Sequence, residues 1–165
     1  MDTRSFVKGI DEVSRIPGTA VFLSPNPENV PQAMLHSLKH YKALHERVVL
    51  LSVNVIDVPR CTDSRRAAVE RLPGNFWPVK VYYGCMEQPR LPEALEWCAD
   101  DGLDIDPMDT SYFLGRETLI PRLDSEMSLW RVKIFAGMFR NAGSAASFFG
   151  LPANRVVELG TQVVL

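Results

Sequence analysis

The stretch from Asp106 to Ile120 concentrates the residue types that can do chemistry. It holds carboxylates at 106, 109 and 117, hydroxyls at 110 to 112 and an arginine at 116. Paired carboxylates serve acid–base catalysis, and hydroxyls beside an arginine bind anions, provided that the fold brings them together. Gly115 has no Cβ, so a ligand or a backbone can approach it closely. The candidate ligand or partner contacts in this stretch are Asp109, Ser111, Tyr112, Gly115, Arg116 and Glu117.

The same carboxylates also have an ordinary structural interpretation. Asp before Pro at 106 and Asp before Thr-Ser at 109 are typical of turns in which the side chain bonds to the backbone. The sequence also lacks a nucleophile elbow, a Walker loop and a Gly-x-Gly-x-x-Gly run, although Gly143-Ser144 could face a phosphate or simply allow close helix packing. We therefore predict that the chain is not an enzyme and has no catalytic residues and no cofactor.

Two further positions could bind a ligand. His36 and His40 are one helical turn apart, which suits two metal ligands, but no third ligand is evident and histidines at a helix end are usually solvated. We predict no metal site and keep His40 as a candidate contact. Arg155 could clamp an anion, and we favour an ion pair with Glu158 instead.

Apolar runs predict the strands that position these residues. The run 19–23 is apolar throughout, as in a buried parallel strand, and 47–58 is a longer strand of the same kind. Alternation predicts a half-buried strand over 76–84 that pairs antiparallel with 47–58, with Pro78 favouring an edge or a bulge. Further strands are predicted at 111–114, where a loop follows, and at 156–165.

Helical spacing predicts the remaining elements. Residues 1–14 are expected to form an N-terminal linker or a short amphipathic helix, and 31–44 a helix that begins at a proline. A third helix runs from Leu91 to about residue 99, and Gly102 follows as its stop. The helix predicted over 126–141 is apolar on more than one face, so it fills a core or forms a homodimer.

This order of elements predicts one α/β domain over 15–165. Its central sheet is expected to have about five strands, mostly parallel with one antiparallel hairpin, and helices on both faces. The stretch 59–74, polar and charged, is predicted to be a loop with one helical turn.

Composition limits the class of protein. The 165 residues carry 18 basic and 20 acidic side chains, for a net charge of −2, with no basic stripe for a nucleic acid. The three cysteines have no paired CxxC spacing, which argues against a disulfide framework and fits a reducing cytosol. No apolar run is long enough to cross a bilayer, so we expect the isolated chain to be soluble.

Six blocks of sequence resemble one known family. They lie at 17–23, 36–40, 44–49, 83–87, 106–117 and 154–163, in the family's order, and together they resemble the carboxy-terminal cytosolic region of the Kup-type potassium-uptake permeases. The resemblance implies a membrane part of about a dozen helices that imports potassium with protons. That family's ion-coordinating residues lie in those helices, so none is carried over to this chain.

The resemblance also implies partners and a location. The expected partner is the membrane-spanning part of the same transporter, and the expected location is the cytosolic face of the cell membrane. The leading hypothesis is therefore a regulatory and assembly domain. Because a related branch of potassium importers binds cyclic di-AMP on a cytosolic α/β domain, the alternative is a nucleotide-sensing module with its pocket at the loop 106–117.

Overall fold

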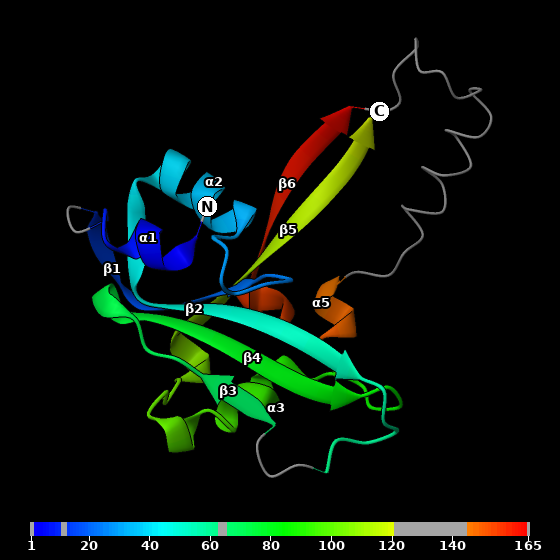
Figure 1. The fold of residues 1–165 in the computed structure, drawn as a ribbon. Helices are drawn as coiled ribbons and strands as arrows, with labels where there is room; N and C mark the ends of the chain where they lie inside the picture. Colours follow the sequence, from blue (N-terminus) through cyan, green and yellow to red (C-terminus); the bar gives the residue numbers. More distant parts are fainter. Residues whose placement is uncertain (1, 11–12, 63–65, 121–144, 165) are drawn as a thin grey trace.

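The chain forms a six-stranded sheet with helices on both faces (Figure 1). The computed structural model describes residues 2–10, 13–62, 66–120 and 145–164, without the side chains of 116–120 and 161–164. The strands are β1 (Ser14–Leu23), β2 (Ala43–Ile56), β3 (Ala67–Val69), β4 (Phe76–Gly84), β5 (Thr110–Ile120) and β6 (Val156–Val164). They lie in the order β3-β4-β2-β1-β5-β6. The α/β class and the mostly parallel sheet predicted from the sequence are confirmed.

Short helices connect these strands. They are α1 (Thr3–Val7), α2 (Gln32–Tyr41), α3 (Leu91–Glu96) and α5 (Ala145–Phe148), with single 3-10 turns η1 (Pro73–Asn75), η2 (Ala99–Asp101), η3 (Pro107–Asp109) and η4 (Ala153–Arg155). The helix predicted over 31–44 is confirmed as α2, but it is shorter than predicted, because Lys42 turns the chain in the left-handed conformation and β2 begins at Ala43. The predicted stop at Gly102 ends η2 instead of α3, in the left-handed conformation that favours glycine. The predicted helix over 126–141 and Gly143-Ser144 lie outside the described residues.

The antiparallel pair is not the one predicted. β2 and β4 run parallel, from Val48 opposite Phe76 to Ile56 opposite Gly84, and β4 pairs antiparallel with β3. The prediction was wrong because the connection after β2 is long enough to carry the chain back to the end where β2 starts, as a parallel crossover requires. β3 lies within that connection.

Pro78 is tolerated because of the same arrangement. β4 is not an edge strand, but β3 covers only part of its length. The Pro78 carbonyl accepts a bond from the Glu70 amide, 2.9 Å away, and the N–H and C=O of one strand residue face the same side. The missing N–H therefore faces Glu70, just past the end of β3, so Pro78 costs one bond on that side and none of the bonds to β2.

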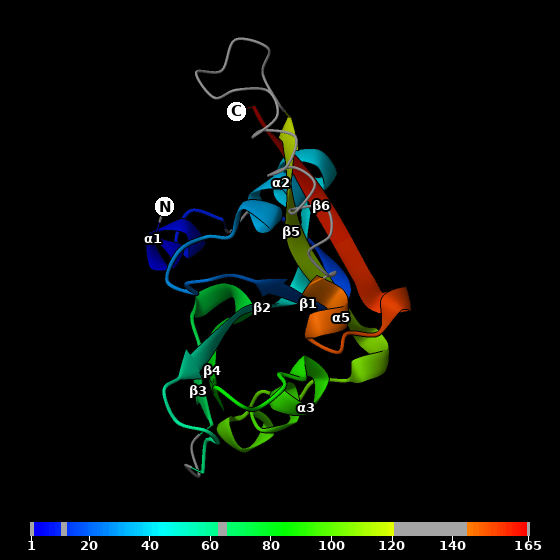
Figure 2. The same cartoon turned by 90° about the vertical axis from the view of Figure 1, so that its right-hand side faces the viewer.

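Two apolar cores lie on opposite faces of the sheet. Alternate residues of β2 divide between them: Val49 and Leu51 face the core under α3, whereas Val48 and Leu50 face the core under α1 and α2. This division explains why 48–51 is continuously apolar. Figures 1 and 2 show α3 and α5 together on one side of the strands, away from α1.

The strands β5 and β6 extend beyond the rest of the sheet. β1 pairs with β5 only as far as Phe22 opposite Phe113, but β5 pairs with β6 to its end, Ile120 opposite Val164. Past Phe113 the two strands therefore form a ribbon that projects from the domain (Figure 1). We call this segment the β5–β6 ribbon.

Candidate functional site

The stretch from Asp106 onward is a turn followed by one long strand. Asp106 precedes η3 and accepts a bond from the Met108 amide at 2.8 Å, and the Thr110 hydroxyl donates to the Asp106 carbonyl at 2.6 Å. β5 then continues to Ile120 without interruption. The prediction of a loop after Leu114 is therefore wrong, because the chain continues to pair with β6 beyond that residue.

The candidate residues of this stretch lie at opposite ends of the sheet. Asp109 comes just before β5, at the amino ends of the parallel strands, while Arg116 and Glu117 lie in the β5–β6 ribbon. At about 3.3 Å per strand residue, Asp109 and Arg116 are roughly 23 Å apart. These residues therefore do not form one site.

Asp109 packs against β1 at a glycine. Gly18 has φ of +100°, and a Cβ added there would lie 2.9 Å from the Asp109 carboxylate. Burial lowers the pKa of the nearby His45, and the charge of Asp109 opposes that effect in part. The contact explains why a glycine stands at position 18 and indicates a structural role for Asp109.

Ser111, Tyr112 and Gly115 occupy three different environments. Ser111 is half-buried, Tyr112 belongs to the core under α3, and burial raises the pKa of its hydroxyl. Gly115 is exposed, and an added Cβ there would meet no described atom within 4 Å. The close approach predicted at Gly115 is therefore not seen among the described residues.

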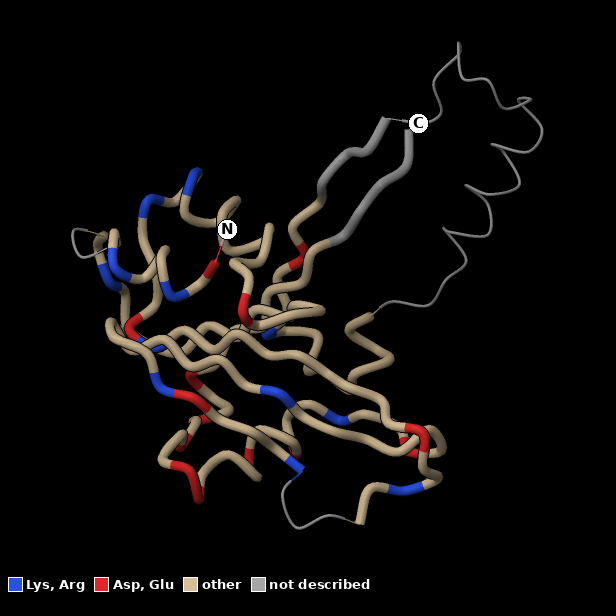
Figure 3. The backbone as a smooth tube through the Cα atoms, viewed as in Figure 1, with Lys and Arg blue, Asp and Glu red and all other residues tan. Residues whose placement is uncertain are grey.

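A small cavity beside Tyr112 lies at the start of the predicted nucleotide pocket. It measures about 110 Å³, and its lining includes Glu96 and Asp104. Ligand pockets for drug-sized molecules measure roughly 300–1,000 Å³. The surrounding segment 91–115 carries seven carboxylates and no lysine or arginine, and Figure 3 shows this concentration of acidic residues. The cavity is thus small and acidic, which does not favour an anionic nucleotide.

His40 and Arg155 lie on separate elements. His40 is exposed in the last turn of α2, with its ring centroid 6.2 Å from that of His36. No group of three potential metal-ligating side chains was found in the described part of the chain. Arg155 ends η4 and is half-buried, and its pairing with Glu158 remains a prediction.

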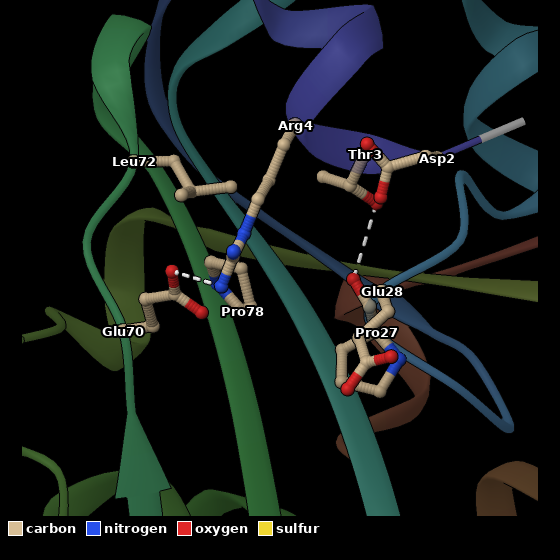
Figure 4. Close-up of a pocket in the computed structure, with 8 residues that line it drawn as sticks. All are labelled: Asp2, Thr3, Arg4, Pro27, Glu28, Glu70, Leu72 and Pro78. Carbon is tan, nitrogen blue, oxygen red and sulfur yellow. Dashed lines mark hydrogen bonds and ion pairs between the residues drawn. The ribbon is translucent and has the colours of Figure 1, made fainter.

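A larger cavity lies where the N-terminal segment meets the sheet (Figure 4). It measures about 250 Å³ and is formed by α1, the connection from β1 to α2 and the β3–β4 edge. The lining residues are Asp2, Thr3, Arg4, Pro27, Glu28, Glu70, Leu72 and Pro78.

Polar contacts around this cavity join α1 to the domain. Thr3 is fully buried; its amide donates to the Glu28 carbonyl at 2.8 Å and its hydroxyl to the Pro27 carbonyl at 3.1 Å. Arg4 reaches across to Glu70 at 2.8 Å, as Figure 4 shows. The α1 segment is therefore bonded both to the β1–α2 connection and to the chain beyond β3.

A carboxylate that the sequence did not reveal organises the other end of β4. Glu87 accepts bonds from the amides of Cys61 at 2.9 Å and Gly84 at 2.6 Å, and its other oxygen bonds Arg66 at 2.5 Å. The two amides and the arginine lower the pKa of Glu87 to about 2. The Arg66 guanidinium also lies 4.5 Å from the centroid of the Trp97 ring. We call Cys61, Arg66, Gly84, Glu87 and Trp97 the Glu87 cluster.

The sequence held one signal of this cluster. The block 83–87 contains Gly84, and a Cβ at that position would lie 2.5 Å from the Pro59 carbonyl oxygen. Only the folded chain shows that the connection after β2 passes this close to Gly84. The Glu87 cluster holds that connection against the end of β4.

Comparison with known proteins identifies the family. Residues 17–165 match the family described as "K+ potassium transporter C-terminal domain". The chain belongs to this family. No solved structure matches the chain. The resemblance to Kup-type permeases seen in the sequence is thereby confirmed.

The curated relatives of this chain are also named as potassium transport proteins. "Probable potassium transport system protein Kup 3" of Dechloromonas aromatica is 60% identical over the whole chain, which covers 27% of that relative. Kup 1 of the same organism is 60% identical, and the Kup protein of Aromatoleum aromaticum 58% identical, each over 92% of the chain and 24% of the relative. The chain thus spans about a quarter of the length of the relatives it matches. In the part of the chain that the structure describes, no helix is long and apolar enough to cross a membrane.

Proposed function

We propose that this K+ transporter C-terminal domain is the cytosolic regulatory and assembly domain of a permease that imports potassium with protons. The family description and the names of the relatives support a potassium transport protein. The membrane-spanning part of the same protein is the partner. The role is non-enzymatic, since the domain changes the conformation of that part and no bond is made or broken.

The observation that carries the proposal is the attachment of α1. The family match begins at residue 17, yet the segment before it is packed into the domain. Val7 and Ile10 belong to the core under α1 and α2, and their exposed fractions are only 3% and 6%. A C-terminal domain is preceded by the rest of its protein, so movement of that part reaches the sheet through α1. The bond from the buried Thr3 to Pro27 and the bridge between Arg4 and Glu70 attach α1 to the domain at two places.

Regulation then follows from a shift of populations. If one conformation of the membrane part is compatible with the docked α1 segment and another is not, docking favours the first by the difference in binding free energy. Any event that loosens α1 would favour the second conformation. The domain need not touch the transported ion for this coupling.

The test compares full-length proteins in cells that lack other potassium uptake. We expect deletion of residues 17–165 to change the rate of potassium uptake, or its response to potassium starvation. Ile10→Asp, which inserts a charge into the core under α2, should reproduce that change, while Lys8→Asp on the exposed side of the segment should not.

Membrane protein levels must be measured alongside uptake, so that loss of the protein is not mistaken for loss of regulation. An unchanged uptake rate and an unchanged response in the deletion variant, at equal protein level, would refute the regulatory role. Equal behaviour of Ile10→Asp and Lys8→Asp would refute the route through α1.

A further inference from the structure

The end of α2 forms an exposed corner of the domain. Lys39, His40, Tyr41 and Lys42 are all exposed, and Tyr41 is 66% exposed. Lys42 adopts the left-handed conformation, with φ of 53°, and its N–H donates to the Leu38 carbonyl, so the chain turns sharply there and enters β2. We call Lys39, His40, Tyr41 and Lys42 the α2 tip.

The lysines of the α2 tip differ from the basic side chains that bridge carboxylates. The basic residues that each bridge a glutamate are Arg4, Arg66, Lys80 and Arg90. Within the described ranges, no carboxylate forms such a bridge with Lys39 or Lys42. The sequence from 29 to 45 also contains no aspartate or glutamate. The α2 tip therefore presents positive charge on both sides of an exposed aromatic ring.

The segment on the other face of the sheet is acidic. α2 packs on the core of one face and α3 on the core of the other. Residues 91–104, which include α3 and η2, carry five carboxylates and no lysine or arginine. Figure 3 shows basic but no acidic residues along α2, and acidic residues gathered around α3. A negatively charged surface would therefore attract the α2 tip and repel the α3 side.

This combination of side chains matches the chemistry of a lipid headgroup layer. Single exposed aromatic residues are common on soluble proteins, so the exposure of Tyr41 alone indicates no partner. At a membrane surface, tyrosine rings lie at the level of the headgroups, and lysines beside them are attracted to anionic lipids. The apolar stem of a lysine lets its ammonium group reach a phosphate while the backbone stays above the headgroup layer.

We propose that the α2 tip docks on the cytosolic leaflet of the membrane, with Lys39 and Lys42 on anionic phospholipid headgroups and the Tyr41 ring at headgroup level. The inference rests on the function proposed above only in placing the domain beside the membrane. α1, which the rest of the protein precedes, packs on the same core as α2. The face of the sheet that is nearest in the chain to the membrane part is thus the face that carries the α2 tip.

The first test uses the full-length protein in lipid nanodiscs. A photo-crosslinking analogue of phenylalanine replaces Tyr41, and mass spectrometry identifies the molecules attached to it after illumination. We expect phospholipid adducts in discs that contain phosphatidylglycerol, and at least about 5-fold fewer in discs of phosphatidylcholine alone. The matched control places the same analogue at Phe148, which is 57% exposed on α5, on the side of the strands that carries α3 (Figures 1 and 2). That position should give no lipid adducts.

Neutral substitutions test the two lysines. Lys39→Gln and Lys42→Asn remove the charges, and asparagine tolerates the left-handed conformation at position 42. Each should lower the yield of lipid adducts at position 41 by about 5-fold, the contribution of one lysine near an anionic leaflet. High salt should lower the yield in the protein with both lysines. Arg60→Gln, at an exposed arginine in the connection after β2, is the control and should leave the yield unchanged.

Each result decides the inference. Lipid adducts at position 41 that depend on phosphatidylglycerol and on the two lysines support it. Adducts only to the membrane-spanning part of the protein overturn it, because the α2 tip then docks on protein, and so does the absence of adducts. Yields that are equal in both kinds of disc, or unchanged by the lysine variants, also overturn it. Uptake in the deletion variant tests the regulatory role separately, so either proposal can fail while the other stands.

Discussion

The two edges of the sheet are built differently. β3 has three residues, and charged residues follow it at Glu70 and Arg71. Side-chain bonds hold the chain on both sides of β3, through Arg66 to Glu87 and through Arg4 to Glu70. β6 has nine residues with one charge, and its ribbon projects from the domain.

The difference indicates which edge is complete. A short edge flanked by charges cannot accept a long partner strand, so the fold ends at β3. The β6 edge has the length to accept a partner. The variants below test how the contacts around β3 and β4 hold that side of the sheet.

The largest expected effect is at Gly84, beside the closed edge. In Gly84→Ala the new Cβ would lie 2.5 Å from the Pro59 oxygen and 2.6 Å from Arg60 Cα, both backbone atoms. The connection must move, and we expect the free energy of unfolding, measured with urea, to fall by about 3 kcal/mol. Gly160→Ala in β6 is the control and should change the free energy of unfolding by less than ~0.5 kcal/mol. Equal effects would contradict the distinction between the edges.

The second effect is a pH dependence at Glu87. Its pKa is lowered from 4.5 to about 2 by the Cys61 and Gly84 amides and by Arg66. The ionised form is therefore favoured in the folded chain, and the resulting stability is present above pH 4.5 and lost as the pH falls toward 2. In Glu87→Gln the urea midpoint should be lower at pH 7 and should fall less steeply over that acid range.

The control for that measurement is Glu96→Gln, an exposed glutamate on α3. Its acid dependence should match that of the unmodified chain. If Glu87→Gln retains the full acid slope, the slope belongs to other carboxylates.

A smaller effect is expected at Arg66. Its guanidinium lies 4.5 Å from the Trp97 ring centroid and 5.4 Å from that of Tyr83. Lysine keeps the charge but loses the planar stacking, so Arg66→Lys should lower the free energy of unfolding by about 1 kcal/mol. Arg71→Lys, at an exposed arginine 5.2 Å from Trp77, should cost less. The reverse order would show that stacking does not hold this connection.

The smallest effect is expected at the exposed bridge between Arg4 and Glu70. The two side chains are 67% and 48% exposed. Arg4→Ala should lower the free energy of unfolding by ~0.5 kcal/mol or less, and the loss should disappear at high salt. Thr3→Val, which removes a buried bond to Pro27, should cost more at both salt concentrations. A large, salt-independent cost at Arg4 would contradict this assignment.

The sequence predicted the parts of the fold that local pattern controls. Continuous apolar residues at 48–51 predicted a central strand, since both faces of β2 are buried. The spacing of Met34 and Leu38 predicted α2. β3 was missed because three residues amid charged neighbours give no period, and the direction of β4 depends on where the connection returns, which no local pattern records.

The site was less predictable for the same reason. Glu87 and Arg66 are 21 residues apart, and their bond requires the connection to pass Gly84 closely. Conversely, the polar stretch at 106–117 suggested one site, but a single long strand separates its two ends. These residues are close in the sequence but far apart in the folded chain.

The burial of Val7 and Ile10 has a practical consequence for anyone producing this domain. A chain cut to begin at residue 17, where similarity to the family starts, would uncover the apolar surface that Phe22 and Met34 share with those two side chains. We expect such a shortened chain to precipitate. Boundaries drawn from similarity alone would thus discard a piece that the hydrophobic interior requires.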